Sequence, residues 1–252
     1  MRDWADRTAL VTGASRGIGR ATAIALAEAG ARTALFARSG SDLESTARAC
    51  RKAGGTQPLV LPVDVTDADK LSAATATAME TFGARLDLLA NVAGGHLRME
   101  RFTEMTDDDW SASFDLHVMA PVRLSRSCFE GLRATQGAVV NIGSLAAIRG
   151  VPHGAAYAAM KAALASVTRT MAVEWARFGI RANTIEPGLV DTDFYDKERD
   201  AMIVERVLAR VPTAAAVTPE AVARLILQLG SPENRDITRT VVRIDGGMSV
   251  KL

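Results

Sequence analysis

The sequence predicts an α/β fold: a single domain over residues 1–252, built on a doubly wound parallel sheet of about seven strands with helices on both faces. Two observations lead to this prediction. Short apolar runs of strand length alternate with longer segments of helical periodicity along the whole chain. Strict alternation of this kind gives parallel strands joined by right-handed crossovers. The chain shows no linker, repeat or low-complexity segment that would divide it.

The expected strands are short apolar runs closed by turn residues. The run "TALVTG" (8–13) is almost wholly apolar, which is typical of a parallel strand that is covered on both faces. The same kind of run recurs along the chain. The expected strands are residues 8–13, 32–37, 58–65, 86–94, 137–144, 180–188 and 240–245.

The segments between the strands carry helix signals. Residues 18–30 close on a glycine, Ser41 and Glu44 have the spacing of a capping box, and Asp67 has the position of an N-cap. The expected helices are residues 18–30, 41–55, 67–82, 107–132, 155–179 and 218–229. The polar stretch 191–200 follows a strand end, and we expect the segment 191–215 to form a substrate lid.

Composition excludes several classes of function. The chain has 30 basic and 29 acidic residues, so its charge gives no reason to expect a nucleic-acid or membrane partner. The N-terminus has no apolar signal segment, and no run approaches 18 apolar residues. Cys50 and Cys128 have no second ligand at metal-binding spacing. We therefore expect reduced thiols, no metal and a cytoplasmic protein.

A glycine-rich turn, "TGASRGIG" (12–19), joins the first expected strand to the first expected helix. Glycine permits positive φ and a close approach of the backbone to a pyrophosphate, whose charge then meets the helix N-terminus. The alternative is a glycine turn that only packs the helix against the strand. Its place in the first β-turn-α unit of a doubly wound chain favours a dinucleotide site.

The stretch "YAAMK" (157–161) places Tyr157 and Lys161 one helical turn apart on the same face. An ammonium at that position stabilises phenolate over phenol, and free tyrosine has a pKa near 10. The pair is therefore either a catalytic acid/base or a surface pair on an ordinary helix. The spacing alone leaves both interpretations open.

Further motifs decide between these interpretations. The glycine turn and the Tyr-Lys pair are accompanied, in order, by "DVTD" (64–67), "NVAG" (91–94), "NIGS" (141–144), "PG" (187–188) and "DGG" (245–247). In this order and over nearly the whole chain, they resemble the motifs of the short-chain dehydrogenase/reductase family. The resemblance implies a Rossmann fold, a nicotinamide dinucleotide and a catalytic Tyr-Lys pair.

The resemblance also assigns roles to individual residues. It implies that Tyr157 gives a proton to the substrate oxygen, that Ser144 hydrogen-bonds the same oxygen, and that Lys161 lowers the tyrosine pKa and holds the nicotinamide ribose. The residues that it places at the cofactor are Gly13, Ser15, Arg16, Gly17, Ile18, Gly19, Arg38, Asp64, Val65, Asn91, Ala93, Gly94, Tyr157, Lys161, Pro187, Gly188, Val190 and Thr192.

The end of the second expected strand indicates which dinucleotide binds. NAD-preferring relatives have an acidic residue there, whereas this chain has Ala37 followed by Arg38, with Arg16 inside the glycine turn. Two guanidiniums without a carboxylate suit the 2′-phosphate of NADP(H), which arginine binds in a bidentate manner. The alternative for Arg38 is a solvated loop charge.

The chain departs from the family at one catalytic position. Within "WSASFDLHVMAPVRL" (110–124), His117 stands where relatives have an asparagine whose backbone carbonyl binds a water. His117 is either a polar residue tolerated in a helix kink or a proton relay. Val92 replaces a second asparagine, and Arg239-Thr240 replaces a Gly-Gln pair of many relatives.

The sequence thus predicts an NADPH-dependent oxidoreductase that reduces a ketone to a secondary alcohol. The substrate is expected to be a 3-oxoacyl thioester on a carrier or a small cyclic, polyketide-type or steroid ketone. His96, Arg149 and His153, with Arg98, are expected near this substrate. The alternative function is a dinucleotide-binding regulator without catalysis. By resemblance, a homotetramer is expected, with the helices 107–132 and 155–179 between subunits.

Overall fold

The computed structural model describes residues 4–95, 99–192 and 201–250 and confirms the predicted seven-stranded parallel sheet. The strand order is β3-β2-β1-β4-β5-β6-β7, so the order reverses between β1 and β4. The strands are β1 (Thr8–Thr12), β2 (Arg32–Ala37), β3 (Leu59–Pro62), β4 (Leu88–Asn91), β5 (Ala138–Ile142), β6 (Arg181–Pro187) and β7 (Val241–Ile244). In this type of sheet, ligands bind outside the carboxyl ends of the strands at the reversal point.

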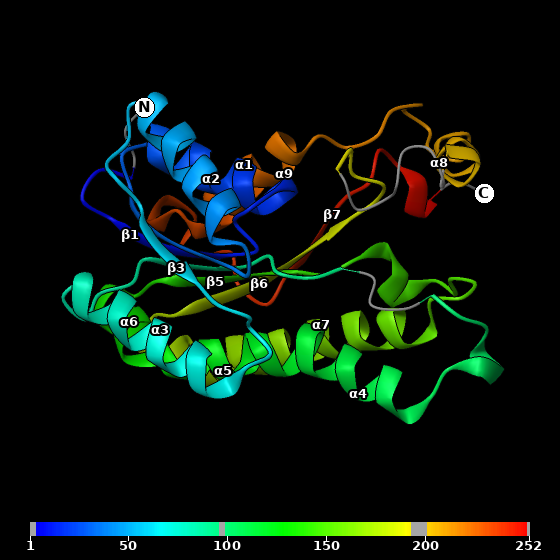
Figure 1. The fold of residues 1–252 in the computed structure, drawn as a ribbon, viewed down its shortest axis with the longest axis horizontal. Helices are drawn as coiled ribbons and strands as arrows, with labels where there is room; N and C mark the ends of the chain where they lie inside the picture. The colour runs from blue at the N-terminus through cyan, green and yellow to red at the C-terminus, as the bar shows by residue number, and fades with distance from the viewer. Residues whose placement is uncertain (1–3, 96–98, 193–200, 251–252) are drawn as a thin grey trace.

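Helices cover both faces of the sheet (Figure 1). One face carries α1 (Gly17–Glu28), α2 (Gly40–Lys52) and α9 (Pro219–Gly230). The other face carries α3 (Ala68–Thr81), α5 (Ala120–Ser127), α6 (Phe129–Thr135) and α7 (Ala155–Trp175), and α4 (Asp107–Phe114) leads into α5. The helix α8 (Ala201–Leu208) lies beyond the carboxyl ends of the strands and was not predicted. None of the described helices is long and apolar enough to cross a membrane.

The sheet separates two apolar cores, which explains the continuous apolar runs in the sequence. Val11 and Leu35 enter the core beneath α1 and α9, whereas Leu10 and Phe36, their neighbours along the strands, enter the core beneath α3 and α5. Because successive side chains of a strand point to opposite faces, a strand that is covered on both sides buries all its positions, and most of its side chains are apolar.

The start of α2 corrects one prediction. Ser39, not Ser41, caps this helix, because the Ser39 hydroxyl accepts a hydrogen bond from the Asp42 N–H at 3.3 Å. Ser41 and Glu44 lie inside the helix, so the predicted capping box is wrong. Two residues separate the end of β2 from the start of the helix, and Leu43 and Cys50 of the helix lie in the core. Residues 58–65 and 86–94 also form shorter strands than predicted.

The predicted helix over 107–132 is interrupted. The chain forms α4, then a π-helical turn over Asp115–Met119, then α5 and α6. Within the turn, the Ala120 N–H donates to the Asp115 carbonyl, five residues back. Pro121 accounts for the interruption, because it has no N–H for the carbonyl four residues earlier, at His117, and its ring collides with that carbonyl in an α-helix. Single π-turns of this kind are frequent at functional sites.

Candidate active site

The predicted glycine turn lies at the reversal point of the sheet, between β1 and the N-terminus of α1. Gly13 and Gly17 have φ values of +66° and +53°, which favour glycine. A Cβ on Gly19 would stand 2.2 Å from the Gly13 carbonyl oxygen, and one on Gly13 would stand 2.9 Å from the Ala93 Cα. Each of these glycines is therefore required for its own reason, either a positive φ or a close backbone contact. Without side chains at these positions, a pyrophosphate could approach the backbone closely.

A methyl group at position 19 tests the close approach of the backbone between Gly19 and Gly13. Gly19→Ala should lower the free energy of unfolding by about 1–3 kcal/mol, because the overlap with Gly13 can be relieved only by moving backbone. The matched control is Gly150→Ala, since a Cβ there would meet nothing within 4 Å. Chemical denaturation of both variants measures the difference. Equal stability of the Gly19 and Gly150 variants would contradict the close approach.

Neutral hydrogen bonds hold the strand ends on either side of the turn. The Thr12 hydroxyl oxygen accepts hydrogen bonds from the N–H groups of Val92 and Ala93, at 3.0 and 2.9 Å. The Asn91 amide donates to Asn141 at 2.8 Å, and the Asn141 amide donates to Thr168 at the same distance. The Asn91 side-chain amide is thus engaged in a hydrogen bond within the protein. This chain of bonds fixes β4, β5 and α7 relative to one another.

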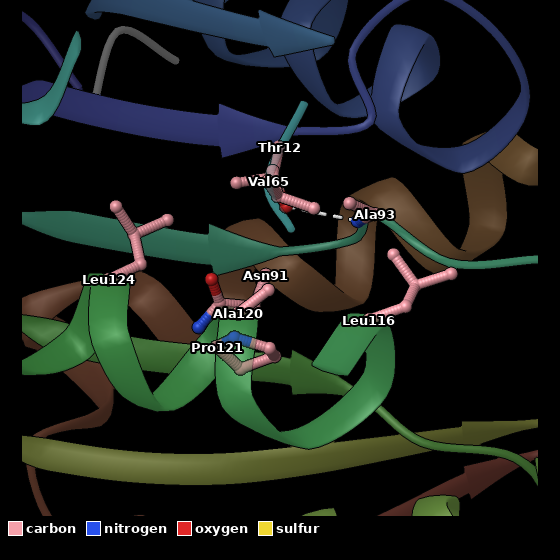
Figure 2. A pocket seen from close by; sticks show the side chains of 8 residues that line it. All are labelled: Thr12, Val65, Asn91, Ala93, Leu116, Ala120, Pro121 and Leu124. Carbon is pink, nitrogen blue, oxygen red and sulfur yellow. Dashed lines mark hydrogen bonds between the residues drawn. The ribbon is translucent and has the colours of Figure 1, made fainter. Parts of the chain in front are cut away.

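A small pocket opens next to this network (Figure 2). Val65 closes it from the chain after β3, where the family resemblance places the adenine, and the Asp64 carboxylate accepts hydrogen bonds from the N–H and hydroxyl of Thr66. The rest of the lining comes from the ends of β1 and β4 and from helix α5 with the π-turn before it. These residues are Thr12, Asn91, Ala93, Leu116, Ala120, Pro121 and Leu124. The lining of the pocket is largely apolar.

The two arginines expected at the 2′-phosphate lie on neighbouring segments. β1 and β2 pair in parallel with Thr12 opposite Phe36, and the Ala14 N–H donates to the Phe36 carbonyl at 3.1 Å. Arg16 in the turn and Arg38 after β2 are therefore brought to the same edge of the sheet, and both side chains are exposed. No hydrogen bond or ion pair engages either guanidinium within the described residues.

The catalytic candidates meet at the end of β5. Lys161 is 4% exposed, and its Nζ donates to the Ile142 carbonyl, the last residue of β5, at 2.7 Å. Ser144 follows two residues later and caps a short turn by accepting from the Ala146 N–H. Lys161 Nζ lies 5.7 Å from the centre of the Tyr157 ring, one turn earlier in α7. Burial lowers the pKa of Lys161 to about 8.

His117 lies beside this pair. It is 1% exposed, and its ring packs edge-to-face on Tyr157 with 5.2 Å between the ring centres and 84° between the planes. Its Nε2 lies 3.0 Å from the carbonyl oxygen of Gly95, just after the "NVAG" segment. The π-turn holds His117 within the segment that the sequence predicted as one continuous helix.

Other candidates lie at the end of β6, before the start of α7 or outside the described residues. Pro187 ends β6, Gly188 donates to the Ile244 carbonyl, and the Thr192 methyl lies 3.2 Å from where a Cβ on Gly17 would be. The Arg149 guanidinium donates to the Met248 carbonyl at 2.7 Å, and His153 is exposed with a φ of +62°. His96 and Arg98, and residues 193–200 of the expected lid, lie outside the described residues.

The sequence did not reveal the residues that hold the strand ends and Lys161 in place through hydrogen bonds inside the fold. Thr12, Asn141 and Thr168 act through neutral hydrogen bonds inside the fold, and the anchor of Lys161 is a backbone carbonyl. A backbone partner leaves no signal in residue identity. A positioning role for Thr12 could have been predicted, because this residue begins the glycine turn at the end of a strand.

The chain is similar in sequence to known proteins. It matches the family described as "Enoyl-(Acyl carrier protein) reductase" over residues 13–249. It is 40% identical to Protein FixR of Bradyrhizobium diazoefficiens, over 94% of this chain and 85% of that protein. It is 34% identical to the 3-oxoacyl-[acyl-carrier-protein] reductase FabG of Vibrio cholerae, covering 96% of this chain and 97% of that protein.

A solved structure shows the same fold. L-sorbose reductase from Gluconobacter frateurii, complexed with NADPH and L-sorbose, superposes with a TM-score of 0.93. The two sequences are 30% identical, and the alignment covers 99% of this chain and 98% of that one. The likeness therefore extends through the sheet, both helix layers and the segments that carry the candidate residues.

Proposed function

The chain belongs to the short-chain dehydrogenase/reductase family and is an oxidoreductase of that kind, and from this premise we propose that it reduces a ketone to a secondary alcohol with NADPH. One observation carries the proposal. Lys161 is buried, is anchored on the Ile142 carbonyl and stands beside Tyr157. Burial of an ammonium is unfavourable, so a structural role alone gives no reason for it.

The proposed chemistry needs two transfers. Bound NADPH supplies the hydride for the carbonyl carbon, and Tyr157 gives its hydroxyl proton to the carbonyl oxygen. The Ser144 hydroxyl donates a hydrogen bond to the same oxygen and stabilises the negative charge that develops there. The Lys161 ammonium stabilises the tyrosinate that the proton transfer leaves behind. The chain retains all three residues, which argues against a regulator without catalysis.

The choice of NADPH rests on charge. Arg16 and Arg38 lie at the edge of the glycine turn, and no carboxylate follows β2 at the position that would accept the ribose hydroxyls. A guanidinium pair offers bidentate bonds to a phosphate. Because cells keep this dinucleotide mostly reduced, the proposed physiological direction is reduction.

The substrate class follows from the relatives. A 3-oxoacyl thioester on a carrier is the first candidate, since FabG of Vibrio cholerae is named for it. A small cyclic, polyketide-type or steroid ketone is the second. His96, Arg149 and His153 stay predictions as substrate contacts, and the segment 191–215 stays a proposed lid.

Family membership also supports assembly as a homotetramer. Phe114 at the end of α4 is 42% exposed and Val173 near the end of α7 is 59% exposed. Large apolar side chains on these two helices are suited to burial between subunits.

A carbonyl panel tests the proposed function. Purified protein is mixed with NADPH and with 3-oxoacyl thioesters, cyclic ketones and steroid ketones, and the loss of NADPH absorbance is followed. We expect turnover of at least one ketone and formation of the matching alcohol. Saturable binding of NADPH without turnover of any ketone would favour the dinucleotide-binding regulator.

The pKa of Lys161 gives a pH dependence. Burial lowers this pKa to about 8, so the ammonium is present below that pH and is lost above it. Because the proposed mechanism uses the ammonium, kcat/KM for NADPH, which reports the free enzyme, should fall as pH rises through about 8. The apparent value belongs to the Tyr157–Lys161 pair as a whole. A kcat/KM for NADPH that stays level well above this pH would contradict the assignment.

A further inference from the structure

His117 is a buried titratable side chain that the mechanism above leaves without a role. It lies in the π-turn between α4 and α5, where its ring is within contact distance of the Tyr157 ring. The family resemblance implies an asparagine at this position. The imidazole has two ring nitrogens, Nδ1 and Nε2, and an asparagine amide has an acceptor only in the place of the first.

The contact of Nε2 fixes the tautomer of the ring. A carbonyl oxygen only accepts hydrogen bonds, so Nε2 at 3.0 Å from the Gly95 oxygen must carry a proton and donate it. A charged imidazolium would be buried next to the Lys161 ammonium, which is unfavourable for both cations. The ring is therefore neutral, and Nδ1 carries the lone pair.

The space beside Gly94 relates Nδ1 to Lys161. A Cβ on Gly94 would lie 3.5 Å from His117 Nδ1 and 3.6 Å from Lys161 Nζ. The Nδ1 edge of the ring and the ammonium therefore border the same small space beside the Gly94 backbone. Because the proton sits on Nε2, the negative end of the imidazole dipole is at Nδ1, on the side of Lys161.

We propose that the Nδ1 side of His117 stabilises the ammonium of Lys161, through its dipole and through a water molecule that bridges the two nitrogens. The inference rests on the reductase function proposed above, in which the ammonium acts on Tyr157. His117 is then a positioning residue: Nε2 holds the ring on Gly95, and Nδ1 keeps Lys161 charged. An ammonium has three donors, and the Ile142 carbonyl takes one of them.

The surroundings of Lys161 make this contribution measurable. The elements packed on the π-turn are α4, α5 and α7, and from α7 the groups that face His117 are Tyr157 and Lys161. Asp115 of the turn itself pairs with Arg123 of α5 at 3.1 Å. Desolvation is the cause that lowers the pKa of Lys161 to about 8. In such a site, one acceptor has a large effect on the charged form.

The test is a direct titration of Lys161 in the protein without cofactor. The chain has five lysines, so isotope-labelled lysine gives few NMR signals, and a Lys161→Met variant assigns the relevant one. Three proteins are compared: the wild type, His117→Phe and His117→Asn. Phenylalanine keeps a ring but has no acceptor, whereas the asparagine oxygen can occupy the place of Nδ1.

We expect the midpoint of the Lys161 titration to fall by about one to two pH units in His117→Phe, as for loss of a hydrogen bond to a charged group. In His117→Asn it should stay close to the wild-type value. Mere loosening of the site would hydrate Lys161 and move the midpoint upward, so the sign separates the proposal from a structural defect. His117→Leu, which also lacks an acceptor, serves if the phenylalanine variant does not fold.

An unchanged or raised midpoint in His117→Phe or His117→Leu would overturn the proposal. A midpoint in His117→Asn that falls as far as in His117→Phe would overturn the assignment to Nδ1. Neither readout uses turnover, so a wild type that reduces no ketone would refute the proposed function and leave this titration decisive for His117.

Discussion

Tyr157→Phe is expected to slow ketone reduction by roughly a hundredfold to ten-thousandfold, the usual worth of a general acid. The substitution removes the hydroxyl that gives its proton to the substrate oxygen. It leaves the ring that packs on His117 and lies near Lys161, so the pocket keeps its shape. NADPH affinity and the melting temperature should therefore stay near their wild-type values.

Steady-state rates with the best ketone of the panel measure the loss, and fluorescence titration with NADPH serves as the control. Turnover near the wild-type rate in Tyr157→Phe would end the case for Tyr157 as the acid. A loss of both turnover and NADPH binding would show that the phenol is needed for the cofactor site, and would also contradict this account.

Arg38→Asp is expected to weaken NADPH binding by roughly tenfold to a hundredfold, since a hydrogen-bonded charged pair contributes about 1.5–3 kcal/mol. The new carboxylate stands after β2, where it can accept hydrogen bonds from the ribose hydroxyls of NADH. Preference should therefore move from NADPH toward NADH. The ratio of kcat/KM values for the two dinucleotides measures the change.

Arg235→Asp makes the same change of charge beyond α9, near the opposite end of the sheet from β2. It should leave the preference between the dinucleotides unchanged. If the wild type already uses NADH better than NADPH, the assignment of Arg16 and Arg38 to a 2′-phosphate is wrong.

Much of the fold could be predicted from the sequence because its elements are defined by local patterns. Buried parallel strands leave continuous apolar runs, and the runs that contain Val11 and Leu35 are found without any knowledge of their partners. The glycine turn could also be predicted. The backbone approaches Gly13 and Gly19 so closely that a Cβ would overlap with it, and the requirement for glycine is therefore written in the sequence.

The interruption of the helix around His117 was only partly predictable. Pro121 marks the place where α-helical bonding fails, but periodicity continues across it, and the sequence therefore suggested one helix over 107–132. Packing against α7 determines whether the helix bends at this place or forms a π-turn. The predicted cap of α2 was wrong for a related reason. Ser39 and Ser41 both lie near the start of the helix, and because the helix begins at Gly40, Ser39 is the cap.

The positions of the candidate site residues were only partly predictable. Tyr157 and Lys161 were paired by their spacing, whereas the anchor of Lys161 on the Ile142 carbonyl is a backbone contact across the fold. The same holds for His117 and the Gly95 carbonyl. Such partners are set by three-dimensional packing and leave no trace in residue type.

The most direct test of the central claim follows a label from cofactor to product. NADPH carrying deuterium at the transferable position of the nicotinamide is mixed with the protein and the best ketone of the panel, and the alcohol is analysed by mass spectrometry and NMR. We expect one deuterium on the carbinol carbon of the product, formed at a rate that collapses in Tyr157→Phe. An alcohol without deuterium at that carbon, or bound NADPH that is never consumed with any ketone, would contradict this claim.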